Sequence, residues 1–156
     1  MQHIENIIRT VAATIEGERN AIANMANTAA VLFHSLPDIN WVGFYLADNA
    51  GLVLGPFQGN VACIRLAEGR GVCGAAVLQR KTIVVPDVHE FPDHIACDSA
   101  SRSEVVVPII VDDKVIGVLD VDSPSVGRFN DEDAVGLEKI VQLLVVGCNW
   151  NWLVTS

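Results

Sequence analysis

The chain begins with apolar residues at helical spacing, namely Ile4, Ile7, Ile8, Val11 and Ile15. Gly17 interrupts this pattern, a second periodic stretch runs from Ile22 to Leu36, and Pro37 ends it. We therefore expect two consecutive helices in the first third of the chain.

Short apolar segments bounded by turn residues come next. They predict strands at 41–46, 52–54, 61–66, 82–85, 105–111 and 115–121, with a short helix at 71–79. Asp112-Asp113-Lys114 is expected to be a tight turn between the last two strands. The segment 86–103 is polar and has no clear period, and a loop this long in a compact domain is often functional.

A final helix is predicted after Asn130, which is a plausible N-cap with Asp133 three residues later. Its apolar stripe consists of Leu137, Ile140, Val141, Leu144, Val145 and Cys148. Helices at both ends of the chain can pack together on one face of an antiparallel sheet. The predicted fold is thus a single α+β domain over residues 1–156, with a ligand pocket under the long loop on the other face.

Composition narrows the classes of partner. The 156 residues are 51% apolar and 19% charged, with a formal net charge of -9. This acidity argues against binding to nucleic acid or to an anionic membrane surface. There is no apolar run long enough for a membrane span and no signal-peptide pattern, so we expect a cytoplasmic protein with reduced, catalytic or metal-bound cysteines.

The four cysteines lie in different contexts. Cys148 is on an apolar stripe and is interpreted as a small buried hydrophobe. Cys63 falls in a predicted strand, Cys97 in the accessible loop, and Cys73 in the first turn of a helix, where the helix N-terminus is expected to lower a thiol pKa. From spacing alone, these three are either a redox set or unpaired bystander thiols.

Three acidic residues are predicted to converge. Strand geometry places Asp120 and Asp122 on the same face, and Glu104 begins the neighbouring strand. Packed carboxylates repel one another, so at least one should hold a proton near neutral pH and act as a general acid. The alternative is that these acids only face solvent at the strand ends.

Trp41 and Tyr45 share a face of the first strand and either wall a pocket for a methyl group or a sulfur, or are ordinary core aromatics. Two further patterns are weaker. Gly69-Arg70-Gly71-Val72-Cys73-Gly74 matches a dinucleotide-binding motif but lacks the βαβ unit, so it is interpreted as a turn with close backbone approach. His89, His94, Cys97 and Asp98 match no strong zinc spacing, and we expect neither a metal nor a cofactor.

Seven segments together resemble the free methionine-(R)-sulfoxide reductases, which are GAF-domain enzymes. They are Gly-Pro-Phe-Gln-Gly at 55–59, Ala-Cys-Ile-Arg at 62–65, Gly-Arg-Gly-Val-Cys-Gly at 69–74, Asp-Val-His at 87–89, His-Ile-Ala-Cys-Asp-Ser-Ala-Ser-Arg-Ser-Glu at 94–104, Gly-Val-Leu-Asp-Val-Asp-Ser at 117–123 and Arg-Phe-Asn-Asp-Glu-Asp at 128–133. The resemblance runs from about Ile39 to Leu137. Asp93 departs from it, because the family often has glycine before this histidine.

The resemblance implies roles for several residues. Cys97 corresponds to the sulfur nucleophile, and Cys63 or Cys73 to the resolving thiol, with Cys63 favoured. The family's active-site acids fall on Glu104, Asp120 and Asp122, and its pocket tryptophan falls on Trp41.

The resulting hypothesis is thiol-dependent reduction of free L-methionine-(R)-S-oxide to L-methionine. It proceeds through a Cys97 sulfenic acid and an intramolecular disulfide that thioredoxin recycles. Carboxylates near Cys97 should raise its pKa, and Arg102, His94 or a bound ammonium are the candidates to compensate. Pairing through the terminal helices predicts a homodimer, and the rival functions are a non-enzymatic GAF sensor of a small molecule or of redox state, or an interaction module with incidental thiols.

Overall fold

A computed structural model describes residues 2–154 of the chain, so the outermost residues of the predicted domain, 1, 155 and 156, lie outside it. The elements are α1 (Gln2–Ile15), α2 (Ala21–Ser35), β1 (Trp41–Asp48), β2 (Gly51–Gly59), β3 (Arg65–Ala67), α3 (Gly71–Gln79), β4 (Ile83–Val85), a 3-10 turn η1 (Val88–Glu90), β5 (Ser103–Val111), β6 (Lys114–Ser123), α4 (Asp131–Gly147) and α5 (Asn151–Val154). The strands form one antiparallel sheet in the order β3-β2-β1-β6-β5-β4. This is the predicted α+β arrangement.

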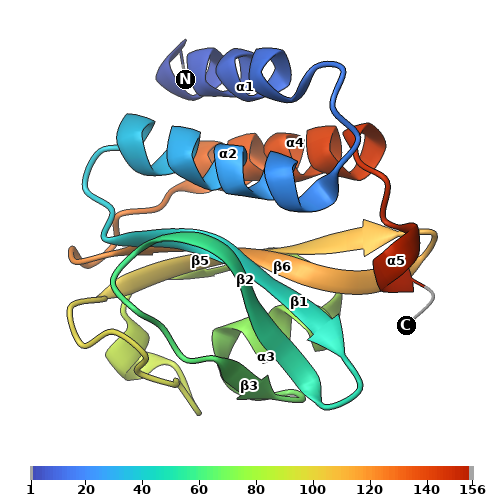
Figure 1. The fold of residues 1–156 in the computed structure, drawn as a ribbon. Coiled ribbons are helices and arrows are strands. Elements are labelled where there is room, and N and C mark those ends of the chain that lie inside the picture. The colour runs from blue at the N-terminus through green and yellow to red at the C-terminus, as the bar shows by residue number, and fades with distance from the viewer. Residues whose placement is uncertain (1, 155–156) are drawn as a thin grey trace.

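The helices α1, α2 and α4 are layered on one face of this sheet, as Figure 1 shows, and α3 lies on the other face. α2 and α4 lie directly on the sheet, while α1 forms an outer layer on α2 and α4. The close approach of α1 to α4 depends on Gly136, because a Cβ there would lie 2.3 Å from Cγ1 of Ile4. The terminal helices therefore pack together as expected, but the first of them does so through the others and not on the sheet.

The start of α4 has the predicted capping box. The Asn130 side chain accepts a hydrogen bond from the Asp133 backbone N–H, and the Asp133 carboxylate accepts one from the Asn130 N–H. Two donors that the helix leaves unsatisfied are thereby paired. The end of α4 carries a feature that the pattern of residues did not predict: the buried Trp150 indole donates to the Leu144 and Val145 carbonyls before the short α5 begins.

Strand alternation divides the apolar side chains between two cores. Side chains such as Val42, Phe44, Leu119 and Val121 point toward the helices, and their strand neighbours pack on the opposite face under α3. The one-residue offset between these sets is the period-2 geometry of a strand. The second face is covered by α3, by η1 and by the loop up to Arg102, and it carries the predicted pocket.

The predicted strand at 61–66 is wrong in extent. Only Arg65–Ala67 pairs with β2, and residues 60–64 form an irregular segment, so Cys63 does not lie in a strand. Val61 and Ile64, whose apolar character suggested the strand, are 88% and 68% exposed. The Ile64 carbonyl still accepts a hydrogen bond from the Leu54 N–H of β2, but residues 60–63 leave the strand pairing, and Cys63 reaches Cys97 at the wall of the pocket.

The first part of the Gly-rich segment 69–74 is a turn, as predicted, and its second part, from Gly71 to Gly74, is the first turn of α3. Gly71 has a φ of +70°, and a Cβ at Gly74 would lie 2.5 Å from the Gly69 backbone. Both positions therefore require glycine for conformation or for space. The segment positions the start of α3 against the sheet.

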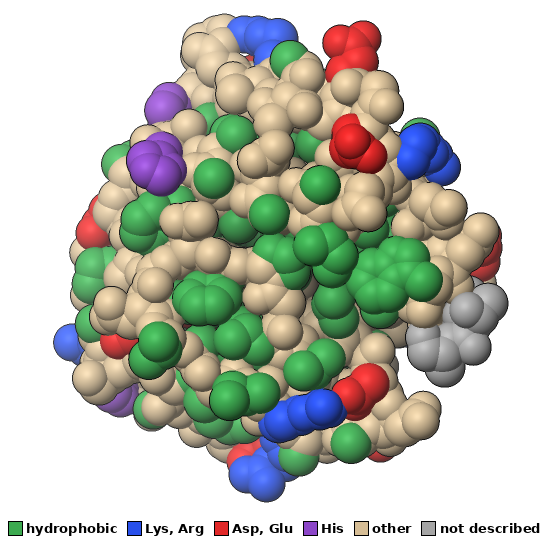
Figure 2. All heavy atoms as spheres, in the orientation of Figure 1, with side chains coloured by type: hydrophobic (Ala, Val, Ile, Leu, Met, Phe, Trp, Pro, Cys, Tyr) green, Lys and Arg blue, Asp and Glu red, His purple; other side chains and the backbone are tan. Residues whose placement is uncertain are grey.

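Apolar side chains also reach the surface. On the face in Figure 2, hydrophobic side chains gather over the sheet and around α5, where Trp152 is 47% exposed, and most charged side chains lie toward the edges of the view. None of the helices within residues 2–154 combines the length and the apolar character required to cross a membrane.

Candidate functional site

A pocket opens on the sheet face opposite the helices, between β1, β6, β5, the start of α3 and the long loop. Its lining includes Trp41, Tyr45, Arg70, Cys73, His94, Cys97, Glu104, Asp120 and Asp122. The site thus brings together all the residues predicted to act in catalysis or substrate binding except Cys63, which is bonded to Cys97 beside the pocket, whereas His89 and Arg102 do not line it. The space within this partly open pocket is about 50 Å³, on a scale where one water needs roughly 10–15 Å³.

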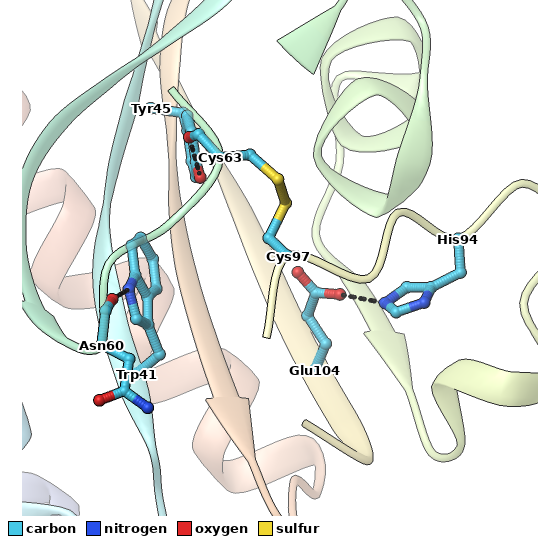
Figure 3. Close-up of a disulfide and its surroundings, with 7 residues drawn as sticks. All are labelled: Trp41, Tyr45, Asn60, Cys63, His94, Cys97 and Glu104. Carbon is cyan, nitrogen blue, oxygen red and sulfur yellow. Dashed lines mark hydrogen bonds and ion pairs between the residues drawn. A yellow bond between two sulfur atoms is a disulfide. The ribbon is translucent and has the colours of Figure 1, made fainter. Parts of the chain in front are cut away.

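Cys63 and Cys97 form a disulfide at one wall of this pocket (Figure 3). Their Cα atoms are 5.4 Å apart, although 34 positions separate them in the sequence. The Tyr45 hydroxyl donates a 2.9 Å hydrogen bond to the carbonyl of Cys63 and so anchors the irregular segment 60–64 to β1. The structure therefore joins the loop cysteine to Cys63 and not to Cys73.

The three acids converge as predicted. Glu104 on β5 lies directly opposite Asp122 on β6, and Asp120 points to the same face two residues earlier. Glu104 and Asp120 are only 7% and 5% exposed. Burial, followed by the charge of a neighbouring carboxylate, raises the pKa of all three carboxyl groups well above their usual range.

This shift means that the acids share protons at neutral pH. Three adjacent carboxylates with little solvent cannot all be ionised at once without a compensating cation. Among the described residues that line the pocket, Arg70 has the one permanent positive charge, and it is paired with Asp93. The arrangement can donate a proton to a ligand and can also accept a cationic group.

Trp41 and Tyr45 form an aromatic wall. Their ring centroids are 5.9 Å apart, and Phe57 also stacks on Trp41, with ring centroids 5.4 Å apart. Trp41 donates from Nε1 to the Asn60 carbonyl at 3.1 Å, which fixes the ring orientation (Figure 3). Both rings line the pocket and also belong to the second core. The two interpretations from the sequence, pocket wall and core aromatic, are therefore compatible.

Cys73 corrects an expectation about thiol reactivity. It lies in the first turn of α3 as predicted, but burial and the nearby acids Asp120 and Glu104 raise its pKa well above the usual thiol range. Its side chain is almost completely buried and it has no disulfide partner. Desolvation and like charge therefore outweigh the helix N-terminus here.

His94 faces Glu104 and not the sulfur of Cys97. Its Nε2 lies 3.9 Å from a Glu104 oxygen (Figure 3), and burial, together with His89, lowers its pKa. A neutral imidazole cannot offset the acids, and Arg102 does not line the pocket. Three groups were considered from the sequence to offset the effect of the acids on the pKa of Cys97. With His94 and Arg102 excluded, a bound cationic ligand remains.

An ion pair that the sequence motifs did not predict holds the loop. Arg70 donates from Nε and an Nη atom to both carboxylate oxygens of Asp93, each at 2.6 Å. The N-cap residue of α3, Arg70, makes no capping hydrogen bond with its side chain. Instead, the Asp93 carboxylate accepts a hydrogen bond from the backbone N–H of Gly71 at 3.4 Å. The signal was present, because Asp93 departs from the family pattern and Arg70 lies in the Gly-rich turn.

These features define a class of protein: an α+β domain with a buried, acidic ligand pocket that has a cysteine pair on its wall. Residues 5–147 match the GAF domain family. The free methionine-R-sulfoxide reductase of Escherichia coli (strain K12) is 53% identical over 132 residues, which is 85% of this chain and 80% of that protein.

Solved structures agree. A free methionine-R-sulfoxide reductase from Neisseria meningitidis, solved in complex with its substrate, has a TM-score of 0.90 at 45% identity and covers 92% of this chain and 87% of its own. A protein from Burkholderia vietnamiensis, described provisionally as a GAF sensor, has a TM-score of 0.91 at 48% identity, covering 96% of this chain and 95% of its own. The chain belongs to the free methionine-R-sulfoxide reductase family of GAF-domain proteins, and the family predicted from the sequence is confirmed.

Proposed function

We propose that this protein reduces free L-methionine-(R)-sulfoxide to L-methionine with its own cysteines. The observation that carries the proposal is the Cys63–Cys97 disulfide beside three buried acids in one pocket. A sulfoxide oxygen leaves only when it is protonated or strongly hydrogen-bonded, and a thiolate is needed at the sulfur. The pocket offers both kinds of group, and the names of the Escherichia coli and Neisseria relatives support the same reaction.

The proposed reaction balances as follows. The Cys97 thiolate attacks the sulfoxide sulfur, and one proton from the acids goes to the sulfoxide oxygen. The new sulfur–sulfur bond and the substrate S–O bond then break as the oxygen is transferred to the Cys97 sulfur, so methionine leaves and Cys97 becomes a sulfenic acid. The Cys63 thiol then condenses with it, releasing water and forming the disulfide; a dithiol supplies two electrons and two protons to restore both thiols.

Substrate selection follows from charge. The acid that stays ionised binds the ammonium group of the free amino acid, and this cation also lowers the cost of a Cys97 thiolate nearby. A methionine residue inside a peptide has no such ammonium. Trp41 and Tyr45 provide an apolar wall for the methylthio end.

The oxidised form is proposed to exclude substrate. The space of about 50 Å³ holds only a few waters, which is too little for a whole amino acid. Reduction of the disulfide frees Cys97 and its loop to move outward. Product release and disulfide formation are then coupled steps.

The remaining parts of the proposal concern the whole protein. We propose thioredoxin as the dithiol, a cytoplasmic location, and a single GAF domain that accounts for residues 1–156. A homodimer formed through the terminal helices would cover apolar surface such as Val146 on α4. Light scattering in solution gives the mass directly, and a monomeric mass would remove the dimer without affecting the reaction.

The test of the reaction uses two serine variants with racemic free methionine sulfoxide. Cys97→Ser is expected to lose all turnover. Cys63→Ser is expected to complete one turnover and then stop when thioredoxin is the reductant, because a sulfenic acid without a resolving thiol is not a thioredoxin substrate. Amino-acid analysis of each epimer measures both outcomes.

Three results are decisive. Multiple turnover by Cys97→Ser would overturn the nucleophile, and normal turnover by Cys63→Ser together with loss in Cys73→Ser would move the resolving role to Cys73. Binding of methionine sulfoxide by the wild-type protein without any consumption would support the sensor alternative, which the provisional description of the Burkholderia relative raises.

A further inference from the structure

Cys73 is a buried thiol that the proposed reaction does not use. It sits in α3 directly above the acids, while Cys63 and Cys97 are joined to each other. Its neighbours Glu104 and Asp120 come from β5 and β6. Three elements that are distant in the sequence thus converge on one sulfur and two carboxylates.

The geometry of this cluster suits a metal ion. One sulfur atom of Cys73 and one carboxylate oxygen each of Glu104 and Asp120 all lie within 4.8 Å of one another. Ligands bound about 2.0–2.3 Å from a tetrahedral zinc are roughly 3.3–3.8 Å apart. Small side-chain rotations therefore bring the three atoms to bonding distance.

An independent observation points to a missing cation. The Asp120 Oδ1 atom is fully buried, and no group within residues 2–154 donates a hydrogen bond to it. A buried acceptor without a partner is costly, and here it faces the pocket beside two other acids. A positive ion at this point satisfies the orphaned oxygen and reduces the repulsion within the cluster.

We propose that Cys73, Glu104 and Asp120 bind a thiophilic divalent cation such as Zn²⁺, with a fourth position open to the pocket. The sulfur selects for soft or borderline metals over Mg²⁺ and Ca²⁺, which take oxygen ligands. Binding displaces the Cys73 proton. The metal occupies the acids that the substrate ammonium uses, so it is an inhibitor that competes with methionine sulfoxide; this second part rests on the proposed function.

Cobalt(II) tests the site without any turnover, because a bound thiolate gives a charge-transfer absorption in the near ultraviolet. The oxidised wild-type protein is the correct sample, since its disulfide removes Cys63 and Cys97 as ligands. We expect the absorption in the wild type and in Cys148→Ala, and its loss in Cys73→Ser. Cys148 is a matched control because it is also a buried free thiol, but it accepts a hydrogen bond from Asn24 on the helical side.

Asp120→Asn provides a second variant that keeps the thiol. It should retain the sulfur absorption at saturating cobalt but bind at least about tenfold more weakly, because a charged oxygen ligand is replaced by a neutral one. An absent signal in the wild type, a signal that persists in Cys73→Ser, or one that is lost in Cys148→Ala would each overturn the site.

The inhibition is measured separately in single turnover, with enzyme that has been reduced and freed of the reductant. Zinc should raise the substrate concentration needed for half-maximal rate at least about tenfold, and this effect should disappear with a chelator and be much smaller in Cys73→Ser. If the protein binds cobalt at this site but its rate of methionine sulfoxide reduction does not change with zinc, only the inhibitory role is overturned. Cobalt binding in a protein that never reduces methionine sulfoxide would instead leave the site intact and overturn the proposed function.

Discussion

At Glu104, Asp120 and Asp122, burial and the charge of a neighbouring carboxylate both raise the pKa of the carboxyl group. Each would be ionised in water, but desolvation and the neighbouring carboxylates raise all three pKa values, so the cluster shares protons near neutral pH. The unpartnered Oδ1 of Asp120 shows that the cluster is not fully satisfied without a ligand. Ligand binding and stability are therefore linked through the same protons.

Stability should fall as the pH rises above about 4. An unfolded chain loses carboxyl protons near that pH, whereas the native protein keeps them because the pKa values are raised. The stabilisation is complete below the unfolded pKa and is lost as the pH rises through the native pKa. Asp48 and Asp93 have lowered pKa values, so their contributions are lost only at more acidic pH.

The check is urea unfolding across this pH range. Asp120→Asn removes one titrating group and should flatten the decline by up to about 1.4 kcal/mol per pH unit. Asp112→Asn, in the exposed turn between β5 and β6, is the matched control and should leave the slope unchanged. Parallel slopes for the wild type and Asp120→Asn would contradict the assignment of protons to the cluster.

At the scale of elements, the loop from η1 to β5 is held to α3 by the Arg70–Asp93 pair. Asp93 has a φ of +65°, a conformation that favours glycine over aspartate. The strained backbone at Asp93 is therefore retained together with its ion pair to Arg70. Ile95 packs near Gly71 in the same contact, which places Cys97 two residues beyond it.

Asp93→Gly should loosen this loop although it relieves the strain. We expect the Cys63–Cys97 disulfide to be reduced about two- to fivefold faster by dithiothreitol, and the KM for methionine sulfoxide to rise by a similar factor with a smaller change in kcat. Asp93→Asn is the control, since asparagine tolerates positive φ and retains one acceptor. High salt should bring the rate of disulfide reduction in the wild type closer to that of the glycine variant, because salt screens an exposed ion pair. Equal rates of reduction in the wild type and both variants would contradict a role of this ion pair in holding the loop.

At the scale of the whole molecule, the helical layers and the pocket lie on opposite faces of one sheet (Figure 1). The outer helix α1 is attached to α4 through the contact of Ile4 with Gly136. Damage to this attachment should change stability without changing the chemistry of the pocket.

Gly136→Ala tests this separation. The new Cβ would lie 2.3 Å from Ile4 Cγ1, so the helices must move apart, at a cost of about 1–3 kcal/mol. Each kcal/mol lowers the Tm by roughly 2–4 °C in a domain of this size, while kcat/KM stays at the wild-type value. Gly147→Ala in the same helix is the control, because its nearest contact is the flexible end of Ile15 at 3.3 Å; a Tm for Gly136→Ala at or above that of the control would refute the packing argument.

The sequence by itself determined the elements and most of the pocket. Period-2 alternation assigned Asp120 and Asp122 to one face, the adjacent strand brought Glu104 beside them, and the Asn130 capping box fixed the start of α4. These are local rules, in which spacing along the chain dictates direction. The same rules put Trp41 and Tyr45 on the pocket side.

Only the tertiary structure decided which groups meet and what their surroundings do to them. Residues 61–64 read as a strand, but they form the irregular segment that carries Cys63 to Cys97. The position of Cys73 at a helix start suggested a lowered pKa, yet burial against the acids raises it. Disulfide partners and pKa values depend on distances between segments far apart in the chain and on the removal of water, and neither quantity is encoded in local spacing.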